Sequence, residues 1–135
     1  MAGLSLKALG MTLTFTVSLL AVGILRGVVS EFASFDKAMV ESTAIMKVTA
    51  EQTQRMKRVA LELSTDGRLP QGPTELAEAY FFLASAGLNA EQSMGALPVT
   101  ARFATAGAFD MAQATDLLTD AQSALGLTVA DTNEN

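Results

Sequence analysis

The stretch SAGLNAEQ, Ser85 to Gln92, predicts that one helix ends and the next begins within a few residues. Gly87 tolerates the left-handed conformation that closes a helix, and Leu88 can fold back on the preceding turn. Asn89 is a good N-cap residue, and Gln92 follows it at the spacing of a capping box. The stretch therefore predicts a compact reversal between two helices.

The same pattern recurs twice further along the chain. Gly107 precedes Asp110 and Gln113, and Gly126 precedes Leu127, Thr128 and Asp131. The helix caps expected from the three junctions are Gly87, Asn89, Gly107, Asp110, Gly126 and Thr128. We therefore expect helices over about 75–86, 90–106 and 111–125, and the start of another at Thr128. Pro98 lacks the backbone N–H of a helix interior and is expected to kink or break the second helix.

Residues 31–66 are expected to form an amphipathic helical segment. Apolar side chains at 32, 35, 39 and 46 fall on one helical face. The sequence Thr49-Ala-Glu-Gln52 has the form of a capping box, so the helix is expected to break and restart there. Met56, Val59 and Leu63 continue an apolar stripe.

The basic residues of this segment, Arg55, Lys57 and Arg58, are expected to face solvent. The Gly- and Pro-rich stretch 64–75 then predicts a loop, with Thr74 capping the next helix. The expected organisation is all-α and has three parts. These are a hydrophobic N-terminal helix over 1–30, the amphipathic segment over 31–66, and a core of short, glycine-capped helices over 74–135.

Residues 8–25 contain no charged side chain and are bracketed by Lys7 and Arg26. Eighteen helical residues span about 27 Å, close to the ~30 Å hydrocarbon core of a bilayer. The apolar run can extend to residue 29, so 8–29 could contact or span a membrane. Two other interpretations remain open at this point: a cleaved signal peptide with a small-residue site near Ala33, and a helix buried against protein.

The composition of the chain limits its chemistry. Among 135 residues there is no cysteine and no histidine, which excludes disulfides, thiolate metal sites and the commonest catalytic base. The remaining candidates for acid–base chemistry are two pairs of carboxylates on predicted helices, Glu75 with Glu78 and Asp116 with Asp120. Solvent-exposed helix faces explain both pairs. We expect no catalytic, cofactor-binding or metal-binding residue, and no enzyme.

Charge is divided unevenly along the chain. Residues 1–68 carry eight basic and six acidic side chains, whereas residues 69–135 carry one basic and eight acidic side chains. An acidic half argues against direct binding of nucleic acid, which needs a basic surface. Only five residues between 79 and 130 are charged. Short helices with so few charges are expected to bury faces against other proteins or other copies of the chain.

An ordered series of short motifs resembles the N-terminal core of phage tail tape-measure proteins. The likeness covers roughly residues 35–135. Its matching positions are Phe35, Ala38, Met39, Val40, Leu83, Ala84, Ala86, Gly87, Ala96, Leu97, Pro98, Ala114, Asp116, Leu117, Leu118, Ala121, Gly126 and Leu127.

The resemblance implies a structural function. A tape-measure protein lies in the lumen of the growing tail, is coated by assembly chaperones, and templates the length of the tube that tail-tube subunits build around it. It also assists genome delivery. The resemblance implies no catalytic residue, and places the protein in the virion tail after assembly in the host cytoplasm.

A ruler of 135 helical residues measures at most ~200 Å. We therefore expect this chain to be a fragment or truncated copy of a tape-measure protein, such as a prophage gene product. The alternative is a small single-pass membrane protein whose helical domain binds other proteins.

Overall fold

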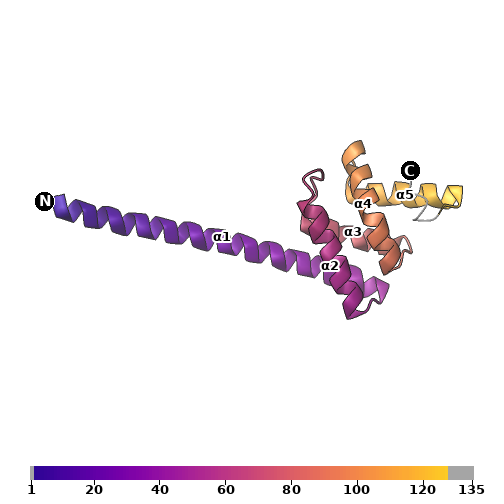
Figure 1. Cartoon of the computed structure of the whole chain (residues 1–135), viewed down its shortest axis with the longest axis horizontal. Helices are drawn as coiled ribbons and strands as arrows, with labels where there is room; N and C mark the ends of the chain where they lie inside the picture. Colours follow the sequence, from indigo (N-terminus) through magenta and orange to yellow (C-terminus); the bar gives the residue numbers. More distant parts are fainter. Residues whose placement is uncertain (1, 128–135) are drawn as a thin grey trace. The chain divides into compact units, whose positions relative to one another are not determined.

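The computed structural model describes the backbone of residues 2–127 and the surroundings of side chains from Ser18 to Leu127. Within residues 2–127 the chain is all-α, as the sequence predicts (Figure 1). The helices are α1 (Ala2–Met46), α2 (Ala50–Thr65), α3 (Pro73–Ser85), α4 (Ala90–Gly107) and α5 (Met111–Leu125). The three helices expected after residue 74 are confirmed to within two residues at each end. Contacts divide the chain into two compact units, residues 1–34 and residues 35–135.

The first unit is the N-terminal part of α1. Its side chains from Ser18 to Ser34 are all exposed, including seven large aliphatic residues and Phe32. The stretch Ser18–Met46 is long and apolar enough to cross a membrane, and almost none of its most apolar window is buried. A signal sequence near an N-terminus also satisfies this criterion of length and hydropathy.

The second unit begins with the last three turns of α1. Phe35, Ala38 and Met39 are buried there, and the hydroxyl of Ser42 donates a hydrogen bond of 2.8 Å to the carbonyl oxygen of Ala77. The predicted apolar face of this segment is confirmed at Phe35 and Met39. Phe32 belongs to the first unit and is 62% exposed.

Helix α2 starts where the capping box predicted a restart. Thr49 is its N-cap, and the hydroxyl of Thr49 accepts a hydrogen bond of 3.2 Å from the backbone N–H of Gln52. The amide oxygen of Gln52 accepts a bond of 2.9 Å from the N–H of Thr49 in return. Met56 is fully buried, and Val59 and Leu63 pack against the core, so the predicted apolar stripe of α2 is confirmed.

Helix α3 lies at the centre of the second unit and contacts α2, α4 and α5. Nearly half of its residues are buried, and Ala77, Ala79 and Ala84 are among them. Small side chains let neighbouring backbones approach closely, which allows several helices to surround this one. Helix α3 begins earlier than expected from a cap at Thr74. Gly72 is its N-cap and Pro73 its first residue, because proline suits the first turn of a helix.

Helix α4 runs without interruption from Ala90 to Gly107 with Pro98 inside it. The expected break at Pro98 is therefore wrong, although a change of axis direction there stays a prediction. Residues 93, 94, 97, 100, 101 and 104 of α4 are buried on one face. Burial of this face on both sides of Pro98 compensates the one backbone hydrogen bond that proline removes.

Candidate functional site

The acidic side chains that could perform acid–base chemistry lie on the surface. Glu75 and Glu78 are exposed on α3, and Asp116 and Asp120 are exposed on α5. Among the described side chains no three acidic residues gather as a metal site would require. The deeply buried ionisable group is Tyr80, whose hydroxyl donates to the Met56 carbonyl oxygen at 3.2 Å. Burial raises the pKa of Tyr80 well above its ordinary value, so the phenol stays neutral and serves packing.

The junction between α3 and α4 has the geometry that closes one helix and opens another. Gly87 has a φ of +93°, and its N–H donates to the Ala84 carbonyl oxygen at 3.0 Å. The N–H of Leu88 donates to the carbonyl oxygen of Leu83 at 3.1 Å, which completes a Schellman motif. The Leu88 side chain packs against the core. This contact of Leu88 with the core explains why the turn is tight.

Helix α4 then opens with a complete capping box. The Asn89 side chain accepts a hydrogen bond of 3.0 Å from the N–H of Gln92, whose amide oxygen accepts one of 3.0 Å from the N–H of Asn89. The local sequence therefore satisfies two backbone donors that would otherwise lack partners at the helix start.

The junction between α4 and α5 corrects one expected cap. Gly107 is the last residue of α4 and does not take the left-handed conformation; Ala108 takes it, with a φ of 53°. A β-carbon at 107 would require the ring of Phe109 to shift, because that ring lies where the β-carbon would be. Asp110 is the N-cap of α5 and accepts a hydrogen bond of 2.8 Å from the N–H of Gln113.

At the end of α5, Gly126 takes the left-handed conformation with a φ of 65°. The N–H of Leu127 donates to the Gln122 carbonyl oxygen at 2.9 Å. The expected cap at Thr128 lies outside the described residues.

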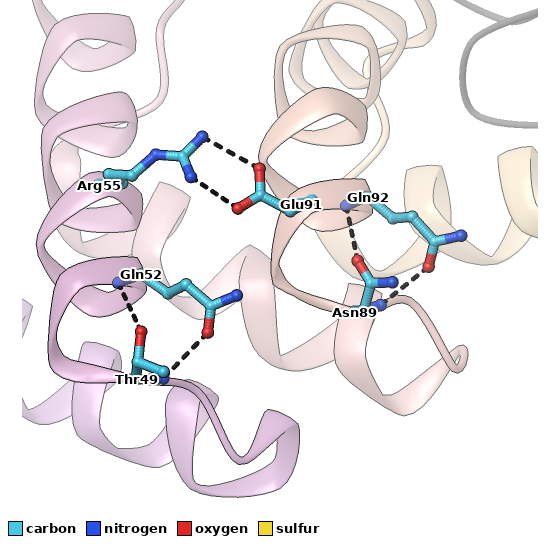
Figure 2. Close-up of polar contacts among 6 residues, drawn as sticks. All are labelled: Thr49, Gln52, Arg55, Asn89, Glu91 and Gln92. Atoms are coloured by element: carbon cyan, nitrogen blue, oxygen red, sulfur yellow. Dashed lines mark hydrogen bonds and ion pairs between the residues drawn. The ribbon is translucent and has the colours of Figure 1, made fainter.

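The starts of α2 and α4 lie side by side, and an ion pair joins them (Figure 2). The guanidinium of Arg55 contacts both carboxylate oxygens of Glu91, at 2.7 and 3.0 Å. Lys57 forms a second pair with Asp36 on α1, with 2.6 Å between Nζ and Oδ1. Arg55 and Lys57 were expected only to face solvent, but each forms an ion pair with an acidic side chain of another helix. Sequence reasoning missed both pairs because their partners are 36 and 21 residues away.

Large apolar side chains remain exposed over several elements of the second unit. They are Val40, Ile45, Leu61, Phe81, Phe109, Leu117, Leu125 and Leu127. Together with the exposed aliphatic residues of α1 before Phe35, they offer apolar surface for contacts with other chains.

The described residues of the second unit form a bundle of short, capped helices around a core rich in small side chains, with large apolar side chains left exposed. The family model of phage-related minor tail proteins matches residues 57–134, and the chain belongs to that family. This family is typical of tape-measure proteins, so the resemblance drawn from the sequence is confirmed. It is a family of tail components that are generally not enzymes. No curated protein and no solved structure matches the chain.

Proposed function

We propose that the chain is the N-terminal part of a tape-measure protein, a scaffold that lies in the lumen of the tail and templates tube length. The family match over residues 57–134 carries this proposal, since it covers α3, α4, α5 and most of α2. Tail-tube subunits and assembly chaperones are the proposed partners. The exposed apolar side chains of the second unit would be covered by these proteins or by other copies of the chain.

The two kinds of helix in the chain suggest two tasks. A helix measures length only while it is extended, and α1, with 45 residues, extends about 68 Å. Helices α2 to α5 are separated by short reversals, so their lengths do not add. We propose that α1 belongs to the measuring part of the scaffold and that the second unit anchors it to the tail.

Lengthening α1 tests this division. The full chain is expressed with the tail-tube protein of the same phage, and tubes are measured by electron microscopy. An insertion of about 28 helix-forming residues in the first unit should lengthen tubes by about 42 Å at 1.5 Å per residue. The matched control places the same insertion in the loop between Gly67 and Pro70, where it should leave tube length unchanged. Tubes of unchanged length that never retain the chain would refute the proposal.

A second candidate function is a single-pass membrane protein whose helical unit binds other proteins. The apolar stretch Ser18–Met46, which is exposed from Ser18 to Ser34, favours it. A tape-measure protein could also use residues 8–29 to contact the host membrane during genome delivery. Fractionation of cells that express the full chain distinguishes the two functions. Recovery only in detergent, with no incorporation into tubes, supports the membrane protein and contradicts the scaffold.

A further inference from the structure

A notch of about 240 Å³ opens between the end of α1 and the middle of α3, inside the second unit. Its lining consists of Ala38, Glu41 and Ser42 from α1 and of Glu78, Phe81 and Phe82 from α3. Sites for drug-sized ligands usually enclose 300 Å³ or more. The notch is therefore sized for one long side chain rather than for a cofactor or nucleotide.

The walls of the notch are aromatic. The Phe81 and Phe82 rings meet edge to face, with centroids 5.9 Å apart and an interplanar angle of 89°. In such a pair one ring directs its edge at the face of the other, and the ring of the more exposed partner can make a further contact on its solvent side. Phe81 is 42% exposed, so part of its ring is accessible to another chain.

The charge of the notch is negative. Glu78 forms no hydrogen bond or ion pair with the described part of the chain. Glu41 has one cationic neighbour, Lys37, at 3.8 Å, and both side chains of that pair are more than half exposed. Such a surface pair is weak and screened by salt. The hydroxyl of Ser42 is already directed at the Ala77 carbonyl oxygen, so the two carboxylates set the chemistry of the notch.

We propose that this notch receives an arginine or lysine side chain of a partner protein. The hydrocarbon stem would lie against the exposed Phe81 ring, and Glu41 and Glu78 would accept hydrogen bonds from the cation. A second copy of the chain is the alternative occupant, because its residues 1–68 carry eight basic side chains, and the dimer measurement distinguishes it from a partner protein. The proposal holds whether or not the chain measures tail length.

A peptide titration tests the notch. The full chain is titrated with acetyl-Ala-Arg-Leu-amide and, as control, with the peptide in which neutral citrulline replaces arginine, and binding is followed by NMR. The arginine peptide should cause saturable shifts at Ala38–Ser42 and Phe81–Phe82, and the citrulline peptide should not. Equal shifts with both peptides, or no saturable shift up to the solubility limit of the arginine peptide, would overturn the proposal.

Two carboxylates on the same helix supply a matched pair of variants. Glu78→Gln should weaken binding of the arginine peptide about threefold to tenfold, whereas Glu75→Gln, one turn earlier and equally exposed, should leave it unchanged. Phe81→Ala should also weaken binding without changing the melting curve by more than a few degrees. Equal effects of Glu75→Gln and Glu78→Gln would contradict the site. A dimer of the full chain that Glu78→Gln dissociates would overturn the partner in favour of a second copy.

Discussion

The ring of Phe109 lies over the bare α-carbon of Gly107, so close that a β-carbon at Gly107 would overlap the ring. The same ring packs on Phe103, with centroids 5.5 Å apart. The end of α4 is thus closed by a left-handed alanine, Ala108, together with an aromatic contact.

Gly107→Ala should destabilise the second unit by about 1–3 kcal/mol, since the Phe109 ring must leave Phe103 to make room. Urea denaturation of the full chain measures the change. Phe109→Ala removes the obstacle, so Gly107→Ala should cost much less in that background. Additive effects of the two substitutions would contradict the contact.

Ala108→Gly should stabilise the chain. Ala108 has a φ of 53°, a conformation that costs an L-residue about 1–2 kcal/mol and glycine very little. Glycine also gives the unfolded chain more conformational entropy, which offsets part of this gain. We therefore expect a net stabilisation of about 0.5 kcal/mol. The control is Ala106→Gly, an exposed position inside α4, which should lose about 1 kcal/mol. Losses at both positions would show that the left-handed residue does not limit stability.

Gly87→Ala measures the free-energy cost of the left-handed backbone conformation at the junction between α3 and α4. Nothing lies within 4 Å of a β-carbon at Gly87, so the expected cost of about 1–2 kcal/mol comes from its φ of +93° alone. Gly67→Ala is the comparison, because that site is equally open and has no left-handed φ. Melting curves that shift equally for both variants would argue against the cap.

The buried Tyr80 should make the folded chain less stable at alkaline pH. Its pKa is raised in the folded chain above the unfolded value of 10.0, because burial disfavours the charged phenolate. The stabilisation is complete below about pH 10 and is lost progressively as the pH rises above that value. Tyr80→Phe should remove this alkaline step and cost about 0.5–1.5 kcal/mol at neutral pH. Since Tyr80 is the single tyrosine, tyrosinate absorbance reports its ionisation directly.

The Arg55–Glu91 pair should contribute modestly. Its side chains are 45% and 54% exposed, so we expect a coupling of about 0.3–1 kcal/mol that falls as salt is added. A double-mutant cycle with Arg55→Gln and Glu91→Gln measures it by urea denaturation. The more exposed Lys37–Glu41 pair is the control and should couple less. A coupling that does not respond to salt would exclude an ion pair.

The sequence by itself determined the all-α fold and the starts of α2, α4 and α5. The capping boxes at Thr49 and Asn89 and the Schellman motif at Gly87 depend on bonds between residues at most five apart. Such local bonds leave a readable pattern of residue types. The sequence also showed, without a structure, the absence of cysteine and histidine and the ordered motifs of the tail protein family.

The tertiary structure alone decided which side chains each helix buries and what gathers between helices. Phe35 and Val40 both lie on the last turns of α1, but Phe35 is buried and Val40 is exposed. Helix α4 continues through Pro98 because its packed face extends on both sides. The notch of Glu41, Glu78 and Phe81 joins residues almost forty positions apart. Contacts over such distances depend on how helices pack, and the local pattern of a chain does not encode that packing.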